Sequence, residues 1–246
     1  MGQPEKHSLA RTSIIAVYHQ HKGRYGYRRI TTVLKEDGMQ INHKRVARIM
    51  NECGLKSLVR IKKYRSYKGQ QGKIARNLLK RNFNARKPNQ KWVTDVTEFN
   101  VAGKKLYLSP IMDLYNREIV SYNISQRPTF HQTMDMLKEA LNRLPPGSRP
   151  ILHSDQGWQY QMRAYQDILR KRKIKQSMSR KANCLDNAVM ESFFGILKSE
   201  MFYINKFKSI DALKKEIDNY IHYYNNDRIK EKLNGLSPVK YRIQAA

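Results

Sequence analysis

The sequence predicts an α/β fold in which a small all-helical N-terminal domain precedes a larger domain built on a mixed sheet. Residues 8–54 show helical periodicity interrupted by glycines. Three strand-like runs begin at Trp92, and helical and strand patterns alternate after residue 129. The chain has 246 residues, 40% of them hydrophobic, which suffices for one good-sized domain and a small one.

Residues 1–55 form the first predicted domain, with helices expected over 8–20, 27–37 and 42–54. Their ends are marked by glycines at positions 23, 26, 38 and 54, and by Asn42 as a cap for the third helix. The third helix carries Lys44, Arg45 and Arg48 on its polar side. Two helices joined by a Gly-containing turn indicate a helix-turn-helix, with these three cations as DNA contacts. An ordinary three-helix bundle with a basic, solvated face is the alternative.

The charge of the chain indicates a nucleic-acid partner. Its formal net charge is +28, and no Asp or Glu occurs between Glu52 and Asp95. A basic stretch of that length is expected of a nucleic-acid binder, with a ribosome-type protein or a merely solvated surface as alternatives. No apolar run approaches the ~18 residues of a membrane span, so no membrane partner is expected. Two cysteines, Cys53 and Cys184, indicate thiols in a reducing cytoplasm rather than a disulfide framework.

Residues 56–90 are polar and basic and predict a linker between the first domain and a second one over 91–246. Within the linker, Lys62, Lys63 and Arg65 alternate with tyrosines. Cations interleaved with aromatic rings can follow phosphates and stack on bases, so we expect these three residues to contact DNA. A plain flexible linker is compatible with the same pattern.

The second domain is expected to begin with three antiparallel strands, the first two joined as a hairpin by the turn 102–105. The predicted elements are strands over 92–101, 106–114 and 118–124, a helix over 129–144, a strand over 151–155, a helix over 160–171, a strand over 174–179, helices over 185–201 and 209–224, and a short basic tail from Pro238. Antiparallel strands followed by alternating helix and strand predict a mixed α/β sheet.

Two carboxylates lie on or beside strands of this sheet. Period-two alternation puts Asp95 on one face with the apolar Val93, Phe99 and Val101. An unpaired carboxylate there costs free energy, which a bound cation removes. Asp155 closes the strand 151–155, and the carboxyl ends of strands are where open α/β sheets place their sites.

A third carboxylate, Glu191, falls on the helix predicted over 185–201, with 35 residues (156–190) between it and Asp155. Asn187 lies four residues before it and Lys198 seven after it, so the three share one helix face. Three carboxylates can hold two Mg²⁺ or Mn²⁺ ions, which prefer oxygen ligands and act together on a phosphodiester. Lys198 would hold a DNA phosphate beside them. Purely structural acids are the alternative.

The segments around these carboxylates resemble the three catalytic blocks of retroviral-integrase-type transposases. The blocks read Trp-Val-Thr-Asp95-Val-Thr, His-Ser-Asp155-Gln-Gly-Trp-Gln-Tyr, and Asp-Asn-Ala-Val-Met-Glu191-Ser-Phe-Phe-Gly-Ile-Leu-Lys. Their spacing and the final lysine match that family's arrangement. The chain is most similar to the OrfB-type transposases of the IS-three insertion-sequence family, since Gly26-Tyr-Arg-Arg-Ile and Tyr223-Tyr-Asn-Asn…Leu236-Ser-Pro also match.

The resemblance implies an RNase H-like core of the retroviral integrase kind that cuts and joins DNA strands at element ends, through a circular intermediate. It implies Asp95, Asp155 and Glu191 as catalytic ligands of Mg²⁺ or Mn²⁺, with water and then a DNA 3′-OH attacking phosphorus directly. We expect Asn187, Arg180 and Lys181 to contact DNA as well. Partners would be double-stranded DNA, both element ends and target, and further copies of the chain, in the bacterial cytoplasm on the nucleoid.

The chain departs from the families that it resembles in two respects. It lacks the His-His-Cys-Cys zinc module of retroviral integrases, and it shows no sustained heptads. The family's fully active transposase is usually a frameshift fusion with an upstream protein, so an upstream-frame partner or fusion is expected. Two other functions remain open, a non-catalytic DNA-binding regulator of transposition and a structure-specific nuclease with the same core.

Overall fold

The computed structural model describes residues 3–58, 74–180 and 183–244. A three-helix domain is formed by α1 (Gln3–Gln20), α2 (Tyr27–Glu36) and α3 (His43–Glu52). The rest is an α/β unit with strands β1 (Lys91–Thr94), β2 (Thr97–Val101), β3 (Lys104–Asp113), β4 (Ile119–Ser125), β5 (Ile151–Ser154) and β6 (Lys175–Met178). Its helices are α4 (Phe130–Arg143), α5 (Trp158–Gln161), α6 (Arg163–Lys171), the 3₁₀ turn η1 (Cys184–Asn187), α7 (Ala188–Leu197), the π-helical η2 (Lys198–Phe202), α8 (Ile210–Asn226), η3 (Glu231–Leu233) and α9 (Pro238–Gln244).

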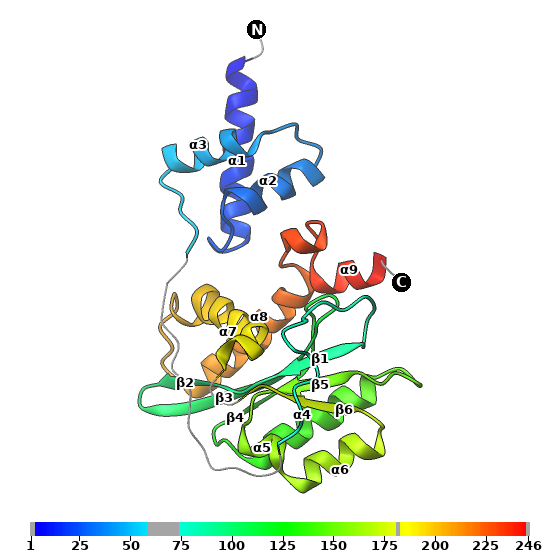
Figure 1. The fold of residues 1–246 in the computed structure, drawn as a ribbon. Coiled ribbons are helices and arrows are strands. Elements are labelled where there is room, and N and C mark those ends of the chain that lie inside the picture. The colour runs from blue at the N-terminus through cyan, green and yellow to red at the C-terminus, as the bar shows by residue number, and fades with distance from the viewer. Residues whose placement is uncertain (1–2, 59–73, 181–182, 245–246) are drawn as a thin grey trace.

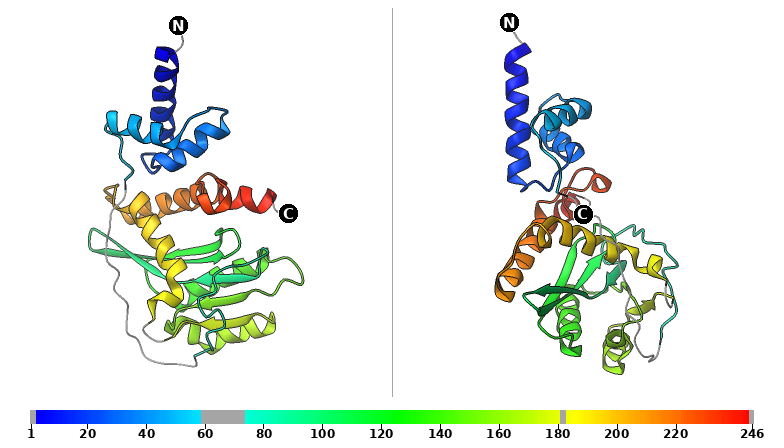
Figure 2. Two further views of the ribbon diagram at one scale, coloured as in Figure 1. Left: turned by 45° about the horizontal axis from the view of Figure 1, so that its top comes forward. Right: turned by 90° about the vertical axis from the view of Figure 1, so that its left-hand side faces the viewer.

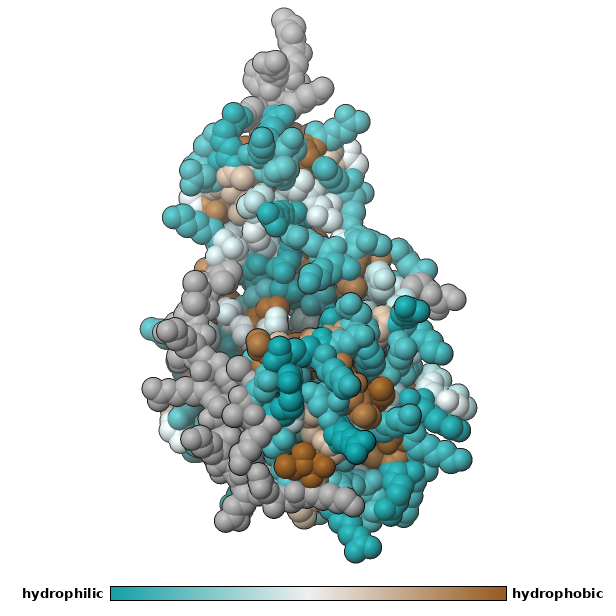
Figure 3. All heavy atoms as spheres, in the orientation of Figure 1, coloured by the Kyte–Doolittle hydropathy of each residue, from teal (hydrophilic) through white to brown (hydrophobic). Residues whose placement is uncertain are grey.

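The α/β unit has three layers, with the sheet between two groups of helices (Figures 1 and 2). Helices α7 and α8 cover one face, and α4, α5 and α6 cover the other. The three-helix domain lies on the side of α8 and α9, away from α4 and α6. Within the described ranges, no helix is long and apolar enough to cross a membrane. The face drawn in Figure 3 is mostly hydrophilic, with apolar side chains in separate patches.

The three-helix domain follows its predicted helices closely. Gly23 takes a positive φ of 72° between α1 and α2, a conformation that favours glycine. The Asn42 side chain caps α3 by accepting a hydrogen bond from the Lys44 backbone N–H at 2.9 Å. Helix α1 begins at Gln3, five residues before the predicted start. The core of the domain is built from apolar residues of all three helices, including Ile14, Ile30, Leu34, Val46 and Ile49.

The strand predicted over 92–101 is interrupted at Asp95 and Val96, so the prediction of one continuous strand is wrong. The pairing with β3 nevertheless keeps its register across the gap, from Thr94 opposite Ile111 to Thr97 opposite Leu108. That register places Asp95 opposite Pro110, which has no N–H to donate to the ladder. The Thr94 hydroxyl instead donates to the Pro110 carbonyl at 2.9 Å. The break frees the backbone around Asp95 from regular pairing.

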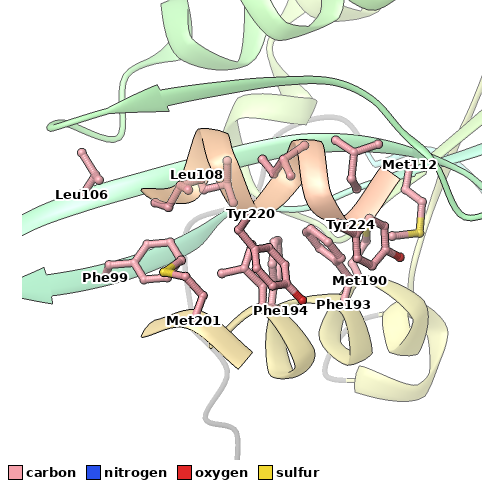
Figure 4. Close-up of a cluster of buried hydrophobic side chains, with 14 of the residues drawn as sticks. Phe99, Leu106, Leu108, Met112, Met190, Phe193, Phe194, Met201, Tyr220 and Tyr224 are labelled. Carbon is pink, nitrogen blue, oxygen red and sulfur yellow. The ribbon is translucent and has the colours of Figure 1, made fainter. Parts of the chain in front are cut away.

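Two apolar cores hold the layers together. One joins β2 and β3 to α7, η2 and α8, and Figure 4 shows Phe99, Phe193, Met201 and Tyr220 meeting there. The other packs β1 and β5 against α4, α5 and α6. Because α7 contributes Met190, Phe193, Phe194 and Leu197 to the first core, its opposite side remains for polar groups.

Three predictions about helices are corrected by the structure. The helix predicted over 160–171 is divided at Met162, whose backbone is extended, into α5 and α6. The helix predicted over 185–201 begins as a 3₁₀ turn, in which Asp186 and Asn187 are engaged by side-chain bonds described below, continues as α7 and ends in π turns. The basic tail from Pro238 is helix α9, since proline suits the first turn and Arg242 forms ion pairs with Asp113 and Glu118.

The described part of the predicted linker, residues 74–90, packs against the α/β unit. Leu79 is buried in the core beside α7. The Leu78 backbone N–H donates to the Ser177 hydroxyl at 2.9 Å, and the Lys91 ammonium donates to the Asn82 and Asn84 carbonyls at 2.8 Å. Asn77 and Arg81 also donate to the Asp186 carboxylate, which brings residues 77–81 beside the segment that leads into α7.

Candidate active site

Asp95 and Asp155 leave the ends of two neighbouring parallel strands at the same level. Strands β1 and β5 pair in parallel, with Val93 beside His153. Two residues further along each chain, the same register brings Asp95 beside Asp155. The sheet topology therefore gathers two carboxylates whose separation in sequence gives no hint of contact.

The environment of the two carboxylates raises the pKa of both. For Asp95 the main cause of the raised pKa is burial, followed by the charge of Asp155 and, more weakly, of Glu191. The Val96 N–H and the positive charge of Lys198 oppose that rise. For Asp155 burial raises the pKa, and a hydrogen bond from the Gly157 N–H opposes it. Like charges held together out of water are typical of a site that binds a cation.

Hydrogen bonds fix the orientation of both carboxylates. Asp95 Oδ1 accepts from the Val96 N–H at 2.7 Å, and Oδ2 accepts from the Asn187 side-chain amide at 2.9 Å. Asp155 Oδ1 accepts from the Gly157 N–H at 2.9 Å. A Cβ at Gly157 would lie 2.9 Å from that same oxygen and 2.5 Å from the Gln159 side-chain amide, so a larger residue would have to displace these side chains.

Glu191 lies in the first turn of α7 and is partly buried, and burial raises its pKa. It is close enough to Asp95 for its charge to act on that residue. Over the described part of the chain, no three His, Cys, Asp or Glu side chains already form a cluster arranged to hold a metal ion. The three carboxylates thus lie near the same end of the sheet, but their side chains are not yet positioned to bind one metal ion together. Their oxygen atoms are of the kind that Mg²⁺ and Mn²⁺ prefer.

Asn187, Glu191 and Lys198 all act on Asp95, as one shared helix face would place them, Asn187 through a hydrogen bond and Glu191 and Lys198 through their charges. Asn187 precedes α7, is buried and binds Asp95. Lys198 begins the π-helical segment, where its ammonium donates to the Glu98 carbonyl at 2.9 Å and lies 5.1 Å from the centre of the Phe99 ring. Its charge still acts on Asp95.

Asp186 anchors the chain immediately before α7. Its carboxylate is fully buried and accepts two bonds from the Arg180 guanidinium, at 2.9 and 3.0 Å. Arg81 and Asn77 bind the same carboxylate at 3.1 and 2.9 Å. The Arg180 bond is the largest cause that holds the pKa of Asp186 far below its usual range. Arg180, predicted as a DNA contact, is thus engaged in positioning the helix that carries Glu191.

His153 contacts the same segment, immediately before α7, through its ring nitrogens. Its Nε2 lies 2.8 Å from the Asp186 carbonyl, which can only accept, so this nitrogen carries the proton. Its Nδ1 lies 2.8 Å from the Ser177 hydroxyl. Burial lowers the pKa of His153, which favours the neutral ring in this position.

The remaining predicted DNA contacts divide between α3 and segments that are not described. Lys44 and Arg48 are exposed on α3, where Arg48 lies 3.5 Å from Glu52. Arg45 is half-buried, and its Nε is buried without a hydrogen-bond partner. Four further candidates lie outside the described residues: Lys62, Lys63, Arg65 and Lys181.

Sequence reasoning missed Glu200, a buried acid in the π-helical segment nine residues after Glu191. It binds Arg228 and Tyr220, and residues of the three-helix domain approach it. An acid among the apolar residues of a predicted helix, in a chain with only 20 acids, was the available signal.

The chain matches three family models. Residues 85–184 and 191–245 match two models described as integrase core domain, and residues 5–63 match an HTH-like domain. It is 54% identical over 244 residues to a putative transposase, InsK, for insertion sequence element IS150 of Escherichia coli K12, covering 99% of this chain and 86% of that protein. It is 58% identical over 207 residues to a transposase-like protein of Haemophilus influenzae, covering 84% and 95%.

A probable transposase for insertion sequence element IS1353 of Shigella flexneri is 37% identical over 98% of this chain, which spans only 47% of that protein. Among solved structures, the HTLV-2 integrase catalytic core domain in complex with magnesium superposes with a TM-score of 0.51 at 20% identity. The match covers 64% of this chain and 98% of that one. It shows that the α/β unit has the RNase H-like fold of retroviral integrase cores.

Proposed function

Because the chain belongs to the transposases of insertion sequences that carry an integrase core domain, we propose that Asp95, Asp155 and Glu191 are its catalytic carboxylates. The observation that carries this proposal is the placement of Asp95 and Asp155 at one level of adjacent strands, with Glu191 near enough to act on Asp95. The substrate would be double-stranded DNA at the ends of the element and at the target.

The donor set fits a divalent cation. Asp95 is buried with raised pKa beside a second carboxylate, and a cation removes the free-energy cost of holding both charges there. Asp95, Asp155 and Glu191 would hold Mg²⁺ or Mn²⁺, which supplies activation of water or a 3′-hydroxyl and stabilisation of the leaving oxygen. The chain itself orients the ligands, through the Asn187 amide and the Gly157 N–H. Lys198 adds positive charge beside them, where a DNA phosphate would lie.

The three-helix domain would bind DNA through the exposed cations of α3, Lys44 and Arg48. In this proposal residues 1–55 bind the DNA at the element ends, residues 56–90 link the two domains, and residues 91–246 cut and join the DNA strands. Two DNA ends must be held together in the reaction, so we propose that several copies of the chain assemble on DNA. We also propose a partner or fusion encoded upstream, and the Shigella flexneri relative, of which this chain spans 47%, is long enough to include such a segment.

The test is an assay on labelled terminal DNA of the insertion sequence with Mg²⁺ or Mn²⁺. The wild-type chain should yield cut and joined strands. Asp155→Asn should abolish both and keep most DNA binding, whereas Asp135→Asn, on the exposed side of α4, should behave as wild type. Activity that survives in Asp155→Asn would overturn the assignment of the site. Cutting without joining by the wild type would favour a nuclease, and binding alone a regulator or a chain that needs its upstream partner.

A further inference from the structure

Two motifs from opposite ends of the chain meet between the three-helix domain and the α/β unit. The hydroxyl of Tyr25, immediately before the motif Gly26-Tyr-Arg-Arg-Ile, donates to the Asp227 carbonyl at 3.2 Å and accepts from the Ile229 N–H at 2.9 Å. The His21 ring stacks on Tyr25 with centroids 3.8 Å apart, and its Nδ1 lies 3.2 Å from the Tyr223 hydroxyl. Ile229 is buried in the core of the three-helix domain. Figures 1 and 2 both show the α1–α2 connection against the end of α8.

Arg24 makes the most extensive contact across this boundary. Its side chain is only 4% exposed, and its Nε donates to the Glu200 carbonyl at 2.9 Å. The guanidinium lies 4.7 Å from the centre of the Tyr223 ring, and one of its nitrogens is 3.9 Å from Glu216. A cation placed between rings and a carboxylate, out of water, is held in one position.

The Glu200 carboxylate completes the network. It accepts two bonds from the Arg228 guanidinium, at 2.8 and 2.6 Å, and one from the Tyr220 hydroxyl at 2.9 Å. Arg29 of the three-helix domain approaches it to 3.6 Å. Removal of one partner from a buried network of charges leaves the others unpaired and is strongly unfavourable. These contacts therefore fix the three-helix domain to the α/β unit.

The network holds the continuous helical segment, α7 followed by η2, that carries Glu191. Helix α7 runs directly into the π-helical segment η2, and Glu200 lies nine residues beyond Glu191. At a rise of about 1.5 Å per residue, the two are separated by roughly 13 Å along this segment. The three-helix domain is thus fixed to the helical segment that positions Glu191. The cations of α3 therefore keep a constant distance from the carboxylate site.

We propose that this docking sets the number of base pairs between the sequence bound by the three-helix domain and the DNA bond that is cut. Arg24 is then a specificity-determining residue, which acts through the position of one domain relative to the other. The inference rests on the proposed function, because it requires that the three-helix domain bind the element end and that the carboxylate site cut it.

The test maps cut positions to single-nucleotide resolution on labelled terminal DNA. Wild type should cut at one bond, and so should Arg11→Gln, which makes the same chemical change on the exposed side of α1. Arg24→Gln should keep cutting, but at several neighbouring bonds, so that the main product falls to a minority. Arg24→Lys, which keeps the charge, should retain much of the accuracy and serves if Arg24→Gln does not fold.

A distance measurement separates this inference from the proposed function. Spin labels at Asn51→Cys on α3 and Lys138→Cys on α4, with both native cysteines changed to Ser, should give one narrow distance that Arg24→Gln broadens. A broad distance in the otherwise native chain would overturn the docking. Cutting at a single bond by Arg24→Gln would overturn the role in spacing. Absence of any cutting by wild type would instead refute the proposed function, and the spacing role with it.

Discussion

The Asn187 side-chain amide donates to Asp95 Oδ2 at 2.9 Å and so joins the break between β1 and β2, where Asp95 lies, to the helix that carries Glu191. Asn187 lies one helical turn before Glu191, and only 4% of it is exposed. Since a carboxylate oxygen can only accept, the amide nitrogen must face Asp95. The amide oxygen is buried without a partner among the described residues, which costs free energy.

Asn187→Ala should lower the rate of DNA cutting by about 10- to 100-fold, the range for loss of a group that orients a metal ligand. DNA binding and the unfolding temperature should change little. Single-turnover assays measure the rate of cutting, gel shifts measure DNA binding, and thermal unfolding measures the third quantity. Asn100→Ala, an exposed change on β2, is the matched control. Equal rates for the two variants would show that Asn187 does not position Asp95.

Divalent cations should stabilise the folded chain through the carboxylate site. A ligand that binds only the folded state at 100 times its Kd adds about 2.7 kcal/mol. Thermal unfolding with Mn²⁺ and then EDTA should show a reversible rise for wild type and Asp135→Asn, and none for Asp155→Asn. Without metal, Asp155→Asn should unfold at a higher temperature than wild type, because it relieves the repulsion that raises the pKa of Asp95. A metal response that persists in Asp155→Asn would place the cation elsewhere.

The fold class predicted from the sequence is confirmed, because it depends on local strand and helix patterns, whereas the catalytic role of Asp95, Asp155 and Glu191 stays a prediction. Strand alternation located β3, β4, β5 and β6 to within a few residues. The break at Asp95 could not be predicted, since it depends on Pro110 being opposite, a pairing fixed by tertiary register.

The protein partners of the polar residues around the site could not be predicted from the sequence. Arg180, Asn187 and Lys198 were expected to face DNA because they are polar and lie near Glu191. The structure gives each a protein partner: Asp186 for Arg180, Asp95 for Asn187 and the Glu98 carbonyl for Lys198. Periodicity shows which face of a helix a residue occupies, but not which distant segment folds against that face.

Asp186→Asn should destabilise the fold by about 1–3 kcal/mol at neutral pH, the range for a buried hydrogen-bonded charge whose arginine partners can return to water. Both partners, Arg180 and Arg81, are about half exposed. The pKa of Asp186 is held below its ordinary value chiefly by Arg180, so the stabilisation is complete above that value and declines as the pH falls below about 4.

Urea unfolding at pH 7, 5 and 3.5 measures this dependence. Asp167→Asn is the matched control, because Asp167 also pairs with two arginines, Arg163 and Arg170, but at the surface. It should change the free energy of unfolding by less than about 0.5 kcal/mol. A loss in Asp186→Asn that is equally small, or that is constant with pH, would contradict the anchoring role.

Lys230→Met should stabilise the protein most at acid to neutral pH. The Lys230 ammonium lies 4.4 Å from the centre of the Tyr224 ring, and burial, followed by Arg228, Arg29 and Arg117, lowers its pKa from 10.5 to about 7. Between these values the unfolded chain holds a proton that the folded chain has released, so the free energy of unfolding of the wild type rises with pH, by up to about 1.4 kcal/mol per unit. Methionine holds no proton, so the advantage of Lys230→Met should be greatest at pH 6 and shrink steadily between pH 7 and 9. Urea unfolding across this range, beside the exposed Lys232→Met, measures it. An advantage that does not change with pH would mean that Lys230 stays charged in the folded protein.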